Sequence, residues 1–174
     1  MEIRVFRRHR WLPILGALII GLLVGVIARL WMRWISTDPE FSWGGTMGII
    51  LGFGIFALAQ ALVYLFINPS RQRWSVALVR VFGALFSLQL FAAAGAIMFP
   101  MVLTGTLALW RQRWFTWLRV VFAAICIGWT LFVAKSEILD KFGWSLVTIG
   151  RVTLMLSLYA FIIRALKSTV GTRS

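Results

Sequence analysis

Four long apolar stretches, each closed by a short polar segment, constrain this chain more than any other feature. They run from about Trp11 to Leu30, Gly45 to Ile67, Trp114 to Ala134 and Trp144 to Ile163. A helix of about 20 residues crosses a hydrocarbon core of about 30 Å, and lipid offers a backbone no partner outside the helix. The sequence therefore predicts an all-α, polytopic transmembrane helix bundle that forms one domain over residues 1–174.

The central run from Val81 to Trp110 allows two interpretations, because its 30 residues contain no charge. As one helix it would be about 45 Å long, which a single span accommodates only with strong tilt. As two helices it would form a short hairpin that turns near Ala94–Ala96 or near Phe99–Pro100. Pro100 fits either the first turn of a new helix or a kink.

The distribution of basic residues separates these alternatives when the amino terminus is placed in the cytoplasm. With a central hairpin, thirteen basic residues are cytoplasmic: Arg4, Arg7, Arg8, Arg10, Arg71, Arg73, Arg80, Arg111, Arg113, Arg119, Arg164, Lys167 and Arg173. Four are then external, namely Arg29, Arg33, Lys135 and Lys141. With a single central span the counts become nine and eight. Since cytoplasmic loops carry the excess of Lys and Arg, we expect about six membrane segments with both termini cytoplasmic, and five spans as the alternative.

The formal net charge of +13 indicates a membrane surface rather than a nucleic acid as the partner. The arginines lie at the ends of apolar runs beside tryptophans, which is typical of interfacial anchoring and of contact with anionic lipid headgroups. Nine of the ten tryptophans flank the runs: Trp11, Trp31, Trp34, Trp43, Trp74, Trp110, Trp114, Trp117 and Trp144. The single histidine, His9, and the single cysteine, Cys126, provide no metal-ligand set, so we expect neither a metal nor a cofactor.

Small residues recur at intervals of four in the first two apolar runs. Ala17, Gly21 and Gly25 share one face of the first run, and the second run has the set Gly44, Gly48 and Gly52. Such spacing lets two backbones approach closely in lipid. We expect these two helices to pack on each other within one chain, with a homo-oligomer interface as the alternative.

Arg151 is the most informative candidate site residue, because it lies about 10 Å inside the last apolar run. An arginine at such a depth usually faces an acidic partner or a hydrated cavity. The candidate partners are Glu137, Asp140, Glu40 and Asp38. We expect a structural ion pair, and a solute or proton site is the alternative.

The remaining candidates lie near the outer end of the first two runs. Arg29 and Arg33 share a helix face, so they either extend to the membrane interface or form an anion-binding pair. Asp38-Pro39-Glu40 predicts the start of a short interfacial helix, with Asp38 as the cap. Capping accounts for these acids without a catalytic role.

The polar connection after the first run carries a resemblance to known proteins. The segments Ala28–Arg33 and Asp38–Thr46, with Ser36 between them, resemble a segment of small bacterial multi-span membrane proteins of uncharacterised function. Gly95–Pro100 and Gly105 are similar to that group as well. The resemblance covers about a third of the chain. It implies a bacterial cytoplasmic membrane and no particular activity.

Three function classes are compatible with these features. The first is a non-catalytic membrane subunit or assembly protein that contacts other membrane proteins. The second is a small channel or transporter with a charged outer vestibule around Arg151. The third is an intramembrane enzyme that uses the outer-loop carboxylates. No residue is assigned a catalytic role, because the sequence has no phosphate-binding glycine loop and no zinc-protease motif.

Overall fold

The computed structural model describes residues 11–37, 42–66, 73–94 and 96–170, and this part of the chain is helical without a strand. The elements are α1 (Trp11–Ile35), α2 (Trp43–Phe66), α3 (Arg73–Ala94), a 3₁₀ turn η1 (Ala96–Met98), α4 (Phe99–Trp110), α5 (Thr116–Val133), a π-helical segment η2 (Ala134–Leu139), α6 (Asp140–Phe142), α7 (Leu146–Ala165) and α8 (Lys167–Val170). The prediction of an all-α bundle is confirmed.

Four of these helices are long and apolar enough to cross a membrane, by length and composition. The segments are Leu12–Ile35, Trp43–Leu65, Thr116–Phe142 and Leu146–Ala165, and Val76–Ser87 and Phe99–Trp110 form two shorter apolar helices. Large apolar side chains cover the outer surface as well as the core: Leu12, Leu23 and Leu30 of α1 are each about 60% exposed. An apolar outer surface of this extent is compatible with a membrane location.

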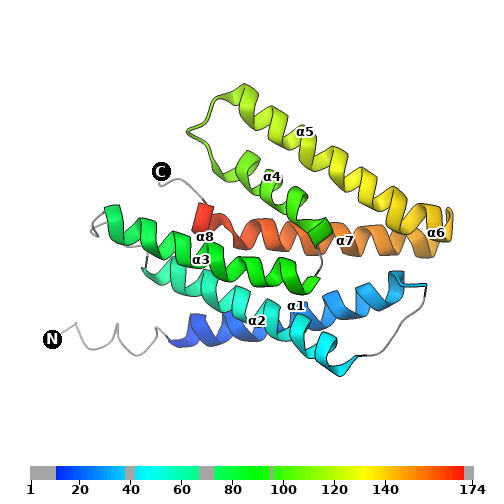
Figure 1. The fold of residues 1–174 in the computed structure, drawn as a ribbon, viewed down its shortest axis with the longest axis horizontal. Coiled ribbons are helices and arrows are strands. Elements are labelled where there is room, and N and C mark those ends of the chain that lie inside the picture. The colour runs from blue at the N-terminus through cyan, green and yellow to red at the C-terminus, as the bar shows by residue number, and fades with distance from the viewer. Residues whose placement is uncertain (1–10, 38–41, 67–72, 95, 171–174) are drawn as a thin grey trace.

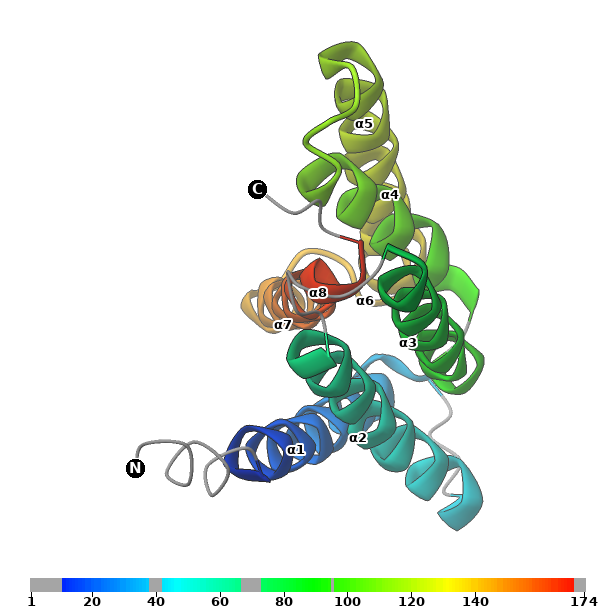
Figure 2. The ribbon, with the colours of Figure 1, turned by 90° about the vertical axis from the view of Figure 1, so that its left-hand side faces the viewer.

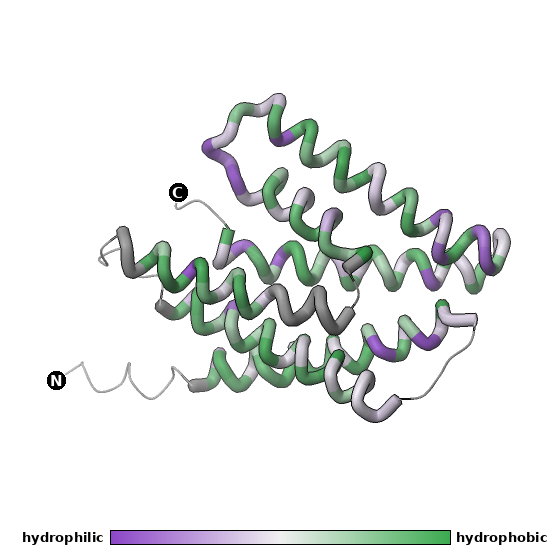
Figure 3. Tube along the Cα trace, viewed as in Figure 1, coloured by the Kyte–Doolittle hydropathy of each residue, from purple (hydrophilic) through white to green (hydrophobic). Residues whose placement is uncertain are grey.

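The long helices run alternately in opposite directions along one axis (Figure 1). One end of the bundle holds α6, the end of α1 and the start of α2, and we call it the α6 end. The other holds α8, the start of α1 and the connection from α4 to α5, and we call it the α8 end. Hydrophilic positions gather toward these two ends, and the helices between them are mainly apolar (Figure 3).

The segment α3–η1–α4 reverses direction, so α4 returns toward the end at which α3 begins (Figures 1 and 2). Pro100 lies in the first turn of α4, where its missing N–H interrupts no helical hydrogen bond. The 12 residues of α4 rise only about 18 Å, well short of a hydrocarbon core. The two helices have few direct contacts with each other, and α8 packs against both.

The closest helix pair is α1 and α2, which meet through glycines of α1. A Cβ added to Gly21 would lie 2.7 Å from the carbonyl oxygen of Phe53, and one added to Gly25 would lie 2.8 Å from the Cα of Ile50. Only glycine allows backbones to approach so closely. The main core lies beside this contact and includes Phe56 together with side chains from α4 and α7.

Candidate functional site

Arg151 lies one and a half turns into α7 and contacts aromatic rings. Its guanidinium carbon is 3.7 Å from the ring centre of Phe142 in α6 and 5.5 Å from that of Trp34 in α1. The indole nitrogen of Trp31 donates a hydrogen bond of 2.9 Å to the carbonyl oxygen of Arg151, which fixes α1 against α7. A cation over aromatic faces is attracted by the ring quadrupoles. The arginine is therefore held by cation–π contacts.

Among the described residues, no ion pair joins Arg151 to the acids expected beside it. Glu137 accepts a 2.6 Å ion pair from Lys141 one turn later, and both side chains are more than one-third exposed. Asp140 is exposed at the start of α6. Asp38 and Glu40 lie outside the described residues. Within the described chain the Nε of Arg151 is buried without a hydrogen-bond partner.

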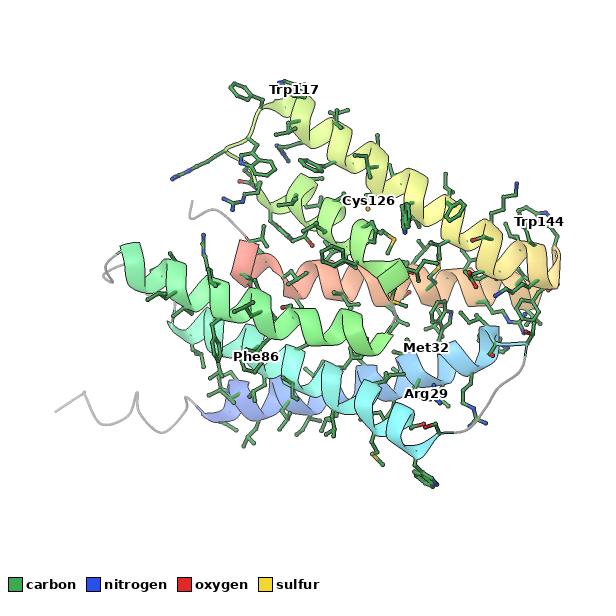
Figure 4. The ribbon with its side chains drawn as sticks, viewed as in Figure 1. Arg29, Met32, Phe86, Trp117, Cys126 and Trp144 are labelled. Carbon is green, nitrogen blue, oxygen red and sulfur yellow. The ribbon has the colours of Figure 1, made fainter. Side chains whose placement is uncertain are left out.

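Arg29 contacts α2, whereas Arg151 contacts side chains of α1 and α6. The Nε of Arg29 donates a 3.1 Å hydrogen bond to Thr46 of α2, so this side chain faces the α1–α2 contact (Figure 4). Arg33 is exposed one turn later. Trp31 and Trp34, by contrast, face α7. Arg29 and Arg151 therefore lie on different sides of α1.

Ser42 caps the amino terminus of α2. Its hydroxyl accepts a hydrogen bond from the backbone N–H of Gly45 at 3.2 Å, and its carbonyl accepts from that of Thr46 at 2.9 Å. This is the geometry of a serine cap. The expected interfacial helix from Asp38 falls outside the described residues.

Known proteins supply no further guide to this site. Comparison with protein-family models, curated proteins and solved structures finds no match to the chain. Among the described residues, no three His, Cys, Asp or Glu side chains are grouped closely enough to hold a metal ion.

In the described part of the chain, the N–H groups of Trp31, Trp110 and Trp129 join separate elements, a role that the sequence did not predict. Besides Trp31, Trp110 of α4 donates to the carbonyl of Ile163 in α7, and Trp129 of α5 donates to the carbonyl of Ile97 in η1, each at 2.8 Å. Trp31, expected in an interfacial belt, is only 3% exposed. Trp117 and Trp144 do lie exposed at opposite ends of the bundle (Figure 4).

A buried polar network joins α2, α3 and α8. The amide nitrogen of Gln60 donates to the hydroxyl of Ser87 at 3.0 Å, and the hydroxyl of Thr169 donates to the amide oxygen of Gln60 at 2.5 Å. Ser87 in turn donates to the carbonyl of Gly83 at 2.7 Å. All three polar side chains are at most 6% exposed. Their hydrogen-bonding groups are used to join helices, as buried polar groups in lipid require.

An apolar groove of about 310 Å³ lies between α3, α4 and the α7–α8 junction. Its twelve lining residues are Val81, Ala84, Leu85, Ser87, Phe99, Val102, Leu103, Thr106, Leu107, Leu166, Thr169 and Val170. The groove exists because α3 and α4 diverge instead of packing together, and α8 forms its floor.

The two sets of small residues predicted for helix packing have different surroundings. Gly21 and Gly25 lie in the α1–α2 contact, and Ala17 is half-buried one turn earlier. On α2, Gly52 is buried, whereas Gly44 and Gly48 are exposed. A Cβ added to Gly48 would meet nothing within 4 Å. The side of α2 that receives Gly21 is instead formed by Phe53, Gly54 and Ala57.

Proposed function

We propose that the chain crosses a bacterial cytoplasmic membrane with six segments, with α3 and α4 as the short central hairpin and both termini cytoplasmic. The α8 end is then the cytoplasmic end. In support, Arg111, Arg113, Arg164 and Lys167 lie at or near this end. The two described acids, Glu137 and Asp140, lie at the other.

The topology has a direct test at the connection between α4 and α5. Gln112 is exposed there, and Cys126 is the single native thiol. In a Cys126→Ala background, we expect Gln112→Cys to react with a membrane-impermeant maleimide only after the cytoplasmic side is opened. Labelling of intact cells at this position would refute the hairpin arrangement.

Within this topology the protein acts as a non-catalytic membrane subunit or assembly protein. The observation that carries this proposal is the exposed face of α2 at Gly44 and Gly48. Glycines four apart on a lipid-facing surface provide a close-packing site for another helix. In α1 the equivalent glycines contact α2, whereas Gly44 and Gly48 of α2 are exposed within the described part of the chain.

The polar groups inside the bundle agree with a structural role. Gln60 bonds to both Ser87 and Thr169, and the hydroxyls of Thr104 and Thr106 donate to backbone carbonyls of their own helix. Such groups are already satisfied by the protein. They stabilise the helix arrangement, as expected for a scaffold that presents its outer surface to a partner.

Native mass spectrometry of the protein extracted with its lipid at natural abundance tests the subunit proposal. We expect a reproducible partner, which Gly48→Leu removes and Gly128→Leu retains. Gly128 is a matched control, because it is an exposed glycine on α5 whose added Cβ also meets nothing within 4 Å. A bare chain in every preparation, or equal partner loss in both variants, would refute the proposal.

A small channel or transporter is the second candidate, and the setting of Arg151 favours it. No described carboxylate neutralises this cation, whose Nε has no hydrogen-bond partner in the described chain. A charge of this kind is suited to attract an anion from the external side. Reconstituted protein should then conduct or exchange anions, and Arg151→Gln should abolish the flux while the thermal unfolding midpoint is retained. Absence of flux in the unaltered protein would refute this candidate.

A further inference from the structure

We propose that the groove between α3, α4 and α8 binds one acyl chain of an anionic phospholipid from the cytoplasmic leaflet. The groove has a volume of about 310 Å³, at the lower end of the range of about 300–1,000 Å³ for small-molecule sites. Along α4 it extends from Phe99 to Leu107, about 12 Å of helix. This shape suits a single hydrocarbon chain rather than a compact solute. The site is independent of the proposed subunit role, and only its assignment to the cytoplasmic leaflet rests on the topology proposed above.

The walls of the groove offer hydrocarbon and no free polar partner. Its three hydroxyl residues are all bonded within the protein: Ser87 donates to Gly83, Thr106 donates to the carbonyl of Val102, and Thr169 donates to Gln60. The other lining side chains are apolar, and Leu85 and Leu103 remain 57% and 41% exposed. A polar solute would lose its hydration here without replacement bonds, whereas an acyl chain loses nothing.

Basic side chains lie at the end of the groove near α8. Arg111 follows the lining residue Leu107 by one helical turn, and Lys167 directly follows the lining residue Leu166. The Nζ of Lys167 is 5.0 Å from the ring centre of Trp110, which places it beside the end of α4. The Nε of Arg111 is buried without a hydrogen-bond partner in the described chain. These two cations therefore lie where the headgroup of a groove-bound lipid would be.

Charge decides which lipid occupies the groove. Every bilayer lipid has acyl chains, and lipid tails are as apolar as the groove, so burial of a chain alone discriminates little. The described residues at this end include cations and no acid, because Glu137 and Asp140 lie at the α6 end. Anionic headgroups are attracted to such clusters, and a tryptophan such as Trp110 suits the interfacial level. The groove fixes the position of the acyl chain, and the cations select for an anionic headgroup.

The experiment uses the full chain in nanodiscs of equal phosphatidylglycerol and phosphatidylcholine with matched acyl chains. One arm measures retained lipids by native mass spectrometry after transfer to detergent. The other uses phosphatidylglycerol with a photoactivatable acyl chain and maps the cross-linked peptides. We expect selective retention of phosphatidylglycerol and cross-links at Leu85 or Leu103.

Two variants and two matched controls test the site. Ala84→Trp fills the groove, and Ala124→Trp adds the same side chain at an exposed alanine of α5 outside it. Arg111→Gln combined with Lys167→Gln removes the cations, and Arg113→Gln removes an exposed neighbouring charge. We expect Ala84→Trp and the double variant to lower phosphatidylglycerol retention by on the order of tenfold. Both controls should retain it.

Several outcomes would overturn the proposal. These are equal retention of the two phospholipids, cross-links outside the groove, or unchanged retention in Ala84→Trp. A co-purifying protein that Ala84→Trp removes while lipid retention is unchanged would assign the groove to a partner helix. Thermal unfolding of each variant shows whether it is folded. If Ala84→Trp is unfolded, Leu103→Trp replaces it, since Leu103 also lines the groove and is partly exposed.

Discussion

Substitution of Gly21 by alanine tests whether the α1–α2 contact holds this bundle together. The new methyl group would lie 2.6 Å from the Cβ of Ala57, 2.7 Å from the carbonyl oxygen of Phe53 and 3.1 Å from the Cα of Gly54. These atoms belong to the backbone of α2 or are attached directly to it, so no side-chain rotation relieves the overlap. The two helices must separate by several tenths of an ångström at least. The dispersion contacts on both sides of the crossing weaken as a result.

The expected magnitude follows from two opposing terms. Overpacking of a close contact costs about 1–3 kcal/mol, whereas replacement of a helical glycine by alanine gains about 0.5–1 kcal/mol. We therefore expect Gly21→Ala to lower the free energy of unfolding by about 1–2 kcal/mol. Gly16→Ala on the same helix has only the favourable term, because its added Cβ meets nothing within 4 Å. It should be neutral or stabilising by at most about 1 kcal/mol.

The assay is reversible unfolding in bicelles by denaturing detergent, with helix content measured by circular dichroism. The difference between the two variants is the decisive quantity, since it cancels the intrinsic preference of alanine for a helix. Gly21→Ala should be less stable than Gly16→Ala by about 2 kcal/mol. Equal stability of the two variants would refute the close α1–α2 contact and the argument built on it.

Three further predictions concern polar and charged groups in the bundle. Tyr159 is 3% exposed, and its hydroxyl has no hydrogen-bond partner in the described chain. Tyr159→Phe should therefore be neutral or raise the free energy of unfolding by up to about 1–3 kcal/mol, and destabilisation would indicate that the hydroxyl has a hydrogen-bond partner. Trp129→Phe removes a bond to the η1 carbonyl and should cost about 1 kcal/mol in the same unfolding assay, with exposed Trp117→Phe as an unaffected control. Since Glu137 pairs with Lys141 and Arg151 contacts aromatic rings, a double-mutant cycle of Arg151→Gln with Glu137→Gln should be additive within about 0.5 kcal/mol. A larger coupling energy would instead support an ion pair between Arg151 and Glu137.

The helical architecture could be predicted from the sequence because of its long apolar runs. Long apolar runs demand helices, and the runs near Trp11, Gly45, Trp114 and Trp144 all became long helices. The role of Pro100 was open, because a helix start and a kink both accept proline. In the structure Pro100 lies in the first turn of α4, after the chain has changed direction between α3 and α4.

The surroundings of single side chains were harder to predict, because they depend on which helix faces lie together. Charge alone suggested carboxylates for Arg151, yet rings from two other elements contact it. A signal was available: Trp31 and Trp34 are three residues apart and therefore share a face of α1. The spacing of four residues likewise identified the glycine sets, but it does not determine which element each set packs against. Gly21 contacts α2, while Gly48 faces outward.

The half-length helix α4 can lie deep in the bundle because α5 supplies donors at both of its ends. Arg119 donates from its Nε to the carbonyl of Ala108 at 3.0 Å, and Trp129 donates to the carbonyl of Ile97. Ala108 is in the last turn of α4, where carbonyls lack helical partners and a cation opposes the helix dipole. Arg119 and Trp129 are ten positions apart, a rise of about 15 Å, which is close to the antiparallel separation of their acceptors, Ala108 in α4 and Ile97 in η1. A buried carbonyl without a partner is costly, so these donors from α5 stabilise the short helix α4, whose divergence from α3 creates the groove.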